Sequence, residues 1–149
     1  MDNKSILCLL IDDDADDREI FSIALSDLDL DVQLITAKDG KEGLEKLGDE
    51  SFRPDFIFLD LNMPRLNGRQ CLSEIRKMHR FNAVPVIIYS TSAQQKDKDE
   101  TLHSGASYFI TKPSDIGVLT KALNSVFSAF MEPENLLTTE INNKNERSN

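Results

Sequence analysis

Acidic residues crowd the end of an apolar run near the start of the chain. Five carboxylates fall within the six positions of DDDADD, which begins at Asp12 and directly follows Ile11. Asp60 likewise follows the apolar residues 56–59. Carboxylates this close together repel one another unless a cation or a proton offsets their charge. Because no His or Cys accompanies them, a hard cation with oxygen ligands is indicated, and Mg²⁺ is the usual cation of such sites.

A hydroxyl and an ammonium group follow two further apolar runs. Ser90 and Thr91 come after residues 84–89, and Lys112 comes after residues 107–110. A lysine at such a position can meet a phosphoryl oxygen with a single positive charge. A nucleophilic carboxylate, a metal, a hydroxyl and a lysine together indicate phosphoryl transfer onto an aspartate.

These side chains can act together only if the elements that carry them bring them to one place. Apolar runs of strand length alternate with segments of helical period, and several runs are apolar on both faces, as in a sheet covered by helices. This alternation predicts an α/β fold, a doubly wound five-stranded parallel sheet with right-handed crossovers. We expect the strands at residues 5–11, 32–37, 56–59, 84–89 and 107–110.

The helical segments differ in how firmly they should pack. Apolar residues repeat at helical spacing in 20–28, 71–78 and 116–130, and a shorter helix is expected at 41–47. The last helix follows a start signal, Pro113-Ser114-Asp115, in which Ser114 or Asp115 is the expected N-cap. Residues 94–104 are almost wholly polar, with Leu102 as the main apolar residue. We therefore expect that helix to be loosely packed and mobile.

The predicted topology gathers the polar residues at one edge of the sheet. In an open α/β sheet, ligands bind beyond the carboxyl ends of the strands. Asp12, Asp13, Asp60, Ser90 and Lys112 all follow such ends. We expect them to line one pocket.

Four segments carry a specific resemblance. LLIDDD, FLDLNMPRLNG, IIYSTSA and YFITKP resemble the signature segments of the receiver domains of bacterial two-component response regulators, a family that includes the chemotaxis response regulator. The segments occur in the family's order and the resemblance spans roughly residues 5–130. It implies a flavodoxin-like (βα)5 fold, and the expected strand order, 2-1-3-4-5, comes from this resemblance.

The resemblance also implies roles for individual acids. Asp60 is similar to the phosphoacceptor of the family. Asp13 and Asp60 match direct Mg²⁺ ligands, and Asp12 matches a ligand that acts largely through water. The backbone carbonyl of Asn62 would complete the protein contacts to the metal.

Outside the acids, two positions depart from the commonest family pattern. Ser90 matches the hydroxyl residue that follows the phosphoryl group, but Thr91 stands next to it, and the choice of Ser90 depends on its spacing from Pro85. Phe109 occupies the aromatic switch position, where Tyr is common. The resemblance implies that activation couples Ser90 to Phe109.

Lys112 matches the lysine that meets the phosphoryl group. The resemblance implies that its bond to Pro113 is cis, which would help to direct the ammonium into the pocket. Only about 5 to 6% of X-Pro bonds in folded proteins are cis, so this is a demanding prediction.

We expect a stand-alone signalling protein, not an enzyme with an external substrate. Such a protein would catalyse only its own phosphorylation and dephosphorylation. Its partners would be a sensor histidine kinase or histidine phosphotransfer protein, a downstream protein target and, as one possibility, a second copy in a homodimer. A net charge of -9 opposes direct nucleic-acid binding. No signal peptide or apolar stretch of spanning length is recognised, so we expect a cytoplasmic protein without membrane insertion.

The chain length of 149 residues suits one domain. We expect a receiver domain at residues 1–131 and a polar, flexible tail at 132–149. Cys8 and Cys71 lie within apolar patterns and lack metal-ligand spacing, so we expect free buried thiols.

The same residues can be compared with the patterns of other kinds of site and protein. Taken alone, DDDADD is more typical of a solvated helix start, and Asp14, Asp16 and Asp17 are expected to belong to one. A haloacid-dehalogenase-type phosphatase also forms an aspartyl phosphate, but it expects Thr or Val where Asp16 stands, and an acid after a later strand where YSTSA has none. A receiver-like protein that only binds partners usually lacks one of the acids or the lysine, and all are present here.

Overall fold

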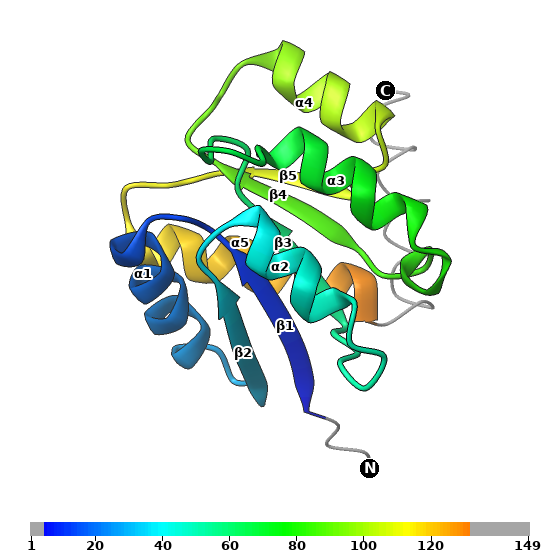
Figure 1. The fold of residues 1–149 in the computed structure, drawn as a ribbon. Helices are drawn as coiled ribbons and strands as arrows, with labels where there is room; N and C mark the ends of the chain where they lie inside the picture. Colours follow the sequence, from blue (N-terminus) through cyan, green and yellow to red (C-terminus); the bar gives the residue numbers. More distant parts are fainter. Residues whose placement is uncertain (1–4, 132–149) are drawn as a thin grey trace, which may run out of the picture.

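The computed structural model describes residues 5–131, which form one parallel sheet with helices on both faces (Figure 1). The expected tail at 132–149 lies outside the described residues. The strands are β1 (Ile6–Ile11), β2 (Val32–Ala37), β3 (Phe56–Leu59), β4 (Val86–Ser90) and β5 (Tyr108–Thr111). The helices are α1 (Ala15–Ser26), α2 (Gly40–Leu47), α3 (Gly68–Lys77), α4 (Gln95–His103) and α5 (Ile116–Met131), with a short 3-10 helix η1 (His79–Phe81).

The strand order β2-β1-β3-β4-β5 confirms the prediction, and all four pairings are parallel. This order places β1 beside β3 at the centre, with Ile11 opposite Leu59 in the register. Asp12 and Asp60 are the next residues on each strand, and the Asp60 amide donates to Ile11 O at 3.0 Å. Two acids far apart in sequence therefore leave the sheet side by side.

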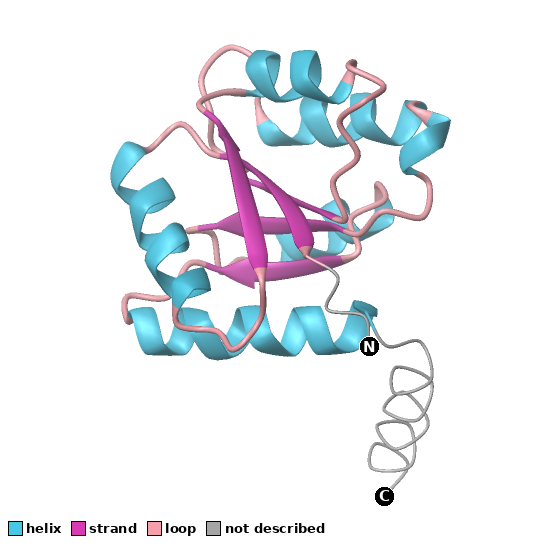
Figure 2. Ribbon diagram, turned by 90° about the horizontal axis from the view of Figure 1, so that it is seen from below, coloured by secondary structure: helices cyan, strands magenta, loops and turns pink. Residues whose placement is uncertain are grey.

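Side chains of each central strand alternate between two apolar layers. Cys8 and Leu10 of β1 pack in the layer covered by α1 and α5, whereas Leu9 and Ile11 pack in the layer covered by α2 and α3. Figure 2 shows the strands as a central layer with helices on both sides. Because both faces are covered, the central strands β1, β3 and β4 are almost wholly apolar, and polar side chains follow at their carboxyl ends.

Polar side chains cap the first backbone amides of helices α3 and α5. Asp115 Oδ1 accepts the Val118 amide at 3.2 Å, so Asp115 caps α5, one of the two residues expected there. Asn67 and Gln70 form a capping box at the start of α3, in which each side chain accepts the other residue's backbone amide.

The fourth strand begins and ends later than predicted. It covers Val86–Ser90 rather than 84–89, because Pro85 has no amide hydrogen to donate and contributes its carbonyl to the Ile57 amide instead. At its other end the strand includes Ser90, which lies opposite Thr111 of β5 in the register. The fifth strand likewise ends at Thr111, directly before Lys112.

Helix α4 exists as predicted, and its main apolar residue is not buried. Leu102 is 44% exposed, and the buried residue of α4 is Thr101, whose hydroxyl donates to the Asp97 and Lys98 carbonyls. Within residues 5–131, no helix has the length and apolar character needed to cross a membrane.

Candidate functional site

The carboxylates converge as the sequence predicts. Asp12 is fully buried and Asp60 is 4% exposed, whereas Asp13 is exposed at the rim. One carboxylate oxygen from each of these three residues lies within 4.8 Å of the other two. Strand pairing therefore assembles an acidic cluster at the carboxyl edge of β1 and β3.

Backbone contacts hold Asp12 in place. Its amide donates to Ala37 O at 3.1 Å, and its Oδ1 accepts the Asp14 amide at 2.9 Å. Arg18 Nη1 donates to Asp12 O at 2.8 Å. No role for Arg18 was predicted from the sequence, although its position within the first turns of α1 places it next to the β1–α1 loop.

Lys112 is the cation within this cluster. Its side chain is 8% exposed, and its Nζ lies 2.8 Å from Asp12 Oδ2, 2.8 Å from Asp17 Oδ2 and 3.7 Å from Asp60 Oδ2. The same ammonium lies 5.1 Å from the centre of the buried Tyr89 ring. Asp17 was expected on a solvated helix start, and its contact with Lys112 is a finding of the structure.

Burial and charge shift the acid–base properties of the site. Burial raises the pKa of Asp60 to about 6, against the opposing charge of Lys112 and with support from the negative charge of Asp12. Burial also raises the pKa of Asp12, again opposed by Lys112. Burial alone would lower the pKa of Lys112, but its hydrogen bonds and ion pairs with Asp12 and Asp17 outweigh this and raise the pKa.

The acidic cluster suits a hard divalent cation. Asp12 Oδ2 is fully buried, and its nearest cation is the Lys112 ammonium 2.8 Å away. All three groups offer oxygen, which Mg²⁺ prefers, and a bound cation would offset the repulsion among them. The set therefore fits the metal that the sequence implies.

The hydroxyl candidates separate clearly. Ser90 is fully buried, its carbonyl accepts the Lys112 amide at 2.7 Å, and its Oγ accepts the Ser92 amide at 3.3 Å. Thr91 is exposed. This favours Ser90 as the group at the site. Asn62, whose carbonyl is the expected metal contact, lies close to Asp60, because its backbone amide donates to Asp60 Oδ1 at 3.3 Å.

The prediction of a cis bond between Lys112 and Pro113 is wrong. None of the peptide bonds in the described part of the chain is cis. The trans form is the more stable one for X-Pro by about 0.5–1 kcal/mol, and Lys112 already reaches Asp12 with it.

Gly68 begins α3 directly behind Asp60. Its amide donates to Leu61 O at 3.0 Å, and a Cβ at this position would lie 2.2 Å from Asp60 O. Any larger residue would displace the backbone of the acid. The loop between β3 and α3 is thus closed tightly under the site.

A polar network links this loop to α4. Arg69, the second residue of α3, pairs with Asp97 and, at 3.1 Å, with Glu100. Asp97 also accepts a hydrogen bond from the Ser92 hydroxyl, and Ser92 O accepts one from Thr111 Oγ1 at 3.0 Å. Sequence reasoning missed this network because its members come from four separate segments.

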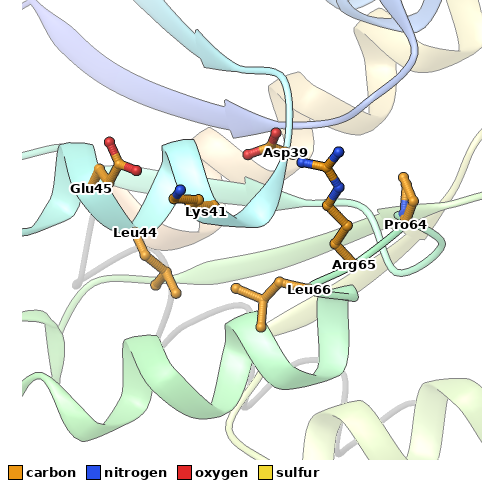
Figure 3. A pocket seen from close by; sticks show the side chains of 7 residues that line it. All are labelled: Asp39, Lys41, Leu44, Glu45, Pro64, Arg65 and Leu66. Atoms are coloured by element: carbon orange, nitrogen blue, oxygen red, sulfur yellow. The ribbon is translucent and has the colours of Figure 1, made fainter.

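A cavity of about 500 Å³ lies between α2 and the β3–α3 loop (Figure 3). Leu44 and Leu66 extend toward each other across it, and Arg65, whose φ of 67° is left-handed, extends toward Asp39. None of the acids of the cluster lines this cavity. The candidate site is therefore the acidic edge, not this cavity.

Comparison with known proteins identifies the family. The response regulator receiver domain family matches residues 8–124. The chain belongs to this family. The relatives include PilH of Pseudomonas aeruginosa, 35% identical over 96 residues, which are 64% of this chain and 78% of PilH. The response regulator Rcp1 of Synechocystis is 27% identical over 135 residues, covering 87% of this chain and 92% of Rcp1.

Other relatives are much longer than this receiver domain. It spans 13% of the sensor histidine kinase CheAY of Helicobacter pylori, to which it is 36% identical over 107 residues. It also spans 32% of a protein-glutamate methylesterase/protein-glutamine glutaminase of Myxococcus xanthus. Receiver domains thus occur within larger proteins among these relatives.

Solved structures agree with the fold. The phosphorylated cyanobacterial phytochrome response regulator RcpA superimposes with a TM-score of 0.78 at 25% identity, covering 87% of this chain and 96% of RcpA. The Mn²⁺-bound form of Rcp1 has a TM-score of 0.73 at 27% identity, with 83% and 92% covered. The chemotaxis protein CheY4 of Vibrio cholerae has a TM-score of 0.72 at 29% identity, with 83% and 99% covered. The flavodoxin-like fold and the place of this chain among response regulators are confirmed.

Proposed function

We propose that Asp60 accepts a phosphoryl group with the help of Mg²⁺ and that this receiver signals through protein contacts. The observation that carries the proposal is the position of Asp60. Its carboxylate is almost buried between two other acids and an ammonium 3.7 Å away. A nucleophile between a metal-binding cluster and a lysine has the equipment for phosphoryl transfer.

Each group has a distinct part in the reaction. An Asp60 oxygen attacks phosphorus, the new O–P bond forms as the donor's P–N bond breaks, and the released imidazole keeps the nitrogen electron pair. Mg²⁺ held by Asp12, Asp13, Asp60 and the Asn62 carbonyl would neutralise phosphoryl charge. Lys112 and the Ser90 hydroxyl are placed to meet phosphoryl oxygens.

The phosphoryl donor in this proposal is a sensor histidine kinase or a histidine phosphotransfer protein. The downstream partner is a protein target or a second copy of the chain, and direct nucleic-acid contact is opposed by the acidic charge. In this proposal the receiver domain occupies residues 1–131, works in the cytoplasm, and passes on a signal rather than acting on an external substrate.

Activation couples the site to the outer strand of the sheet. Phe109 of β5 is half-buried, and Lys98 of α4 lies 5.9 Å from the centre of its ring. Movement of the Ser90 hydroxyl toward a phosphoryl group would free space into which this ring could turn. This is a population shift between two states of one fold.

The test is chemical labelling of the intact chain. Acetyl phosphate with Mg²⁺ should add one phosphoryl group, read by intact mass, and the adduct should be labile to hydroxylamine. Asp60→Asn should abolish labelling because it removes the nucleophile, and chelation by EDTA should prevent it in the wild type.

Asp16→Asn is the matched control, since it removes an exposed acid from the nearby first turn of α1. It should label like the wild type. Undiminished labelling of Asp60→Asn, or labelling that EDTA leaves unchanged, would contradict the proposal.

A further inference from the structure

The ammonium of Lys112 is held on the α1 side of the site. Its Nζ lies 2.8 Å from both Asp12 Oδ2 and Asp17 Oδ2, but 3.7 Å from Asp60 Oδ2. The shorter distances are those of charge-assisted contacts, and the longer one exceeds a hydrogen bond. Lys112 therefore stands back from the carboxylate that we propose as nucleophile.

Asp17 differs from the other two partners of Lys112. Asp12 and Asp60 belong to the cluster that suits a metal, whereas Asp17 lies outside it. Its carboxylate is hydrogen-bonded to the ammonium across 95 positions of sequence. Asp17 is thus a partner of Lys112 that is not also a candidate metal ligand.

The start of α1 fixes where Asp17 points. Asp14 is the N-cap and accepts the Asp17 amide on its Oδ1 at 3.0 Å. The Arg18 side chain ties the next residue to Asp12 O at 2.8 Å. The backbone on both sides of the Asp17 side chain is therefore anchored to the loop that carries the acids, which gives its carboxylate a fixed position.

We propose that Asp17 is a positioning residue for phosphoryl transfer. It holds the Lys112 ammonium back from Asp60, so that the Asp60 carboxylate is free to attack and an N–H of Lys112 is free for the incoming phosphoryl group. An ammonium has three donors, of which Asp12 and Asp17 occupy two. Because this role is defined by phosphoryl transfer to Asp60, it rests on the function proposed above.

Loss of Asp17 should bring the ammonium onto Asp60. With one anchor removed, the nearest uncompensated carboxylate is the one at 3.7 Å. A direct ion pair would occupy the nucleophile in the ground state and slow its attack. The expected effect of Asp17→Asn is a labelling rate about tenfold lower, the usual effect of one hydrogen bond to a charged group.

The experiment compares the wild type with three variants of the full chain at saturating Mg²⁺. Labelling rates with acetyl phosphate are measured by intact mass, and the ¹⁵N signal of the Lys112 ammonium is followed by NMR in the unphosphorylated protein. Asp17→Asn removes the carboxylate, Asp17→Glu keeps one, and Asp16→Asn removes a neighbouring exposed charge. Thermal unfolding verifies that each variant is folded.

We expect Asp17→Asn to label slowly and to shift the Lys112 signal, Asp17→Glu to recover part of the rate, and Asp16→Asn to match the wild type in both. Equal rates for Asp17→Asn and Asp16→Asn, or an unmoved Lys112 signal, would overturn the proposal. Failure of the wild type to label would instead count against the proposed function, and the NMR signal would still decide whether Asp17 holds Lys112.

Discussion

The Asp60 carboxyl is almost buried, and burial makes its ionised form less stable than it is in water. Burial raises its pKa to about 6 from an ordinary value of 3.8. A carboxyl whose pKa is higher in the folded than in the unfolded chain favours folding at low pH, below the unfolded value. That contribution is lost as the pH rises through about 6, so the ionised group destabilises the fold at neutral pH.

Asp60→Asn should therefore stabilise the protein at pH 7 in the absence of divalent cations, by about 3 kcal/mol of unfolding free energy. The gain should vanish near pH 4, where the wild-type acid is protonated. Urea denaturation at both pH values measures the difference, and Mg²⁺ should stabilise the wild type more than the variant. Parallel profiles of unfolding free energy against pH for the two proteins would show that the pKa of Asp60 is not raised on folding.

Single residues also show how far the sequence could be interpreted. Asp12, Asp13 and Asp60 were predictable because each follows a strand, and neighbouring parallel strands end at the same edge. Asp17 was not, because its partner Lys112 comes from the far end of the chain and only the packing of α1 brings them together. The prediction of a cis bond before Pro113 was wrong. It depended on family resemblance alone, and Lys112 reaches Asp12 with a trans bond.

Helix α4 is held mainly by polar contacts. Arg69 of α3 pairs with Asp97 and Glu100 near its start. Just beyond the end of α4, the half-buried Arg76 of α3 donates to the Gly105 carbonyl. The same guanidinium also donates to the carbonyls of Phe81 and Val84, which precede β4. Burial lowers the pKa of this guanidinium, and its three carbonyl acceptors are neutral. The two arginines of α3 thus set the two ends of α4.

Arg69→Gln should loosen the start of α4. The pair is partly exposed, so we expect a modest effect, with amide exchange in residues 95–103 rising about threefold. Hydrogen exchange read by NMR tests this. Lys77→Gln, which removes an exposed pair with Glu74 elsewhere on α3, is the control and should leave those amides unchanged. An equal change in both variants would show that Arg69 has no specific hold on α4.

The existence of α4 was predictable, but its orientation was not. Polar composition indicated weak packing, and Leu102 was the main apolar residue in the segment. The structure buries Thr101, whose hydroxyl donates to the Asp97 carbonyl of the same helix, and leaves Leu102 exposed. Glu100, the residue before Thr101, pairs with Arg69 of α3.

At the scale of the molecule, several apolar side chains lie exposed on α4, β5 and α5. Leu102 is 44% exposed, Tyr108 is 51% exposed and Val118 is 54% exposed. The elements that carry them are connected to the site through Ser90, Lys112 and the network around Ser92. This surface is suited to bind a protein when the site changes state.

Beryllofluoride, which mimics a phosphoryl group, should therefore alter α4, β5 and the start of α5. Backbone NMR shifts with and without it in the presence of Mg²⁺ measure the response. Asp60→Asn should show no such change, because the mimic needs the carboxylate. Shift changes confined to residues 40–47, the helix α2, would show that the output surface does not lie on α4, β5 and α5.

The two cysteines have a practical consequence for following how the molecule opens. Cys8 lies in the apolar layer under α1 and α5, Cys71 lies in the layer under α2 and α3, and both are fully buried. Burial raises the pKa of each thiol to about 12, so neither is a reactive thiolate while its layer stays closed. Modification by a thiol reagent then reports separately on each side of the sheet. The native chain thus carries its own pair of chemical labels for distinguishing one-sided opening from complete unfolding.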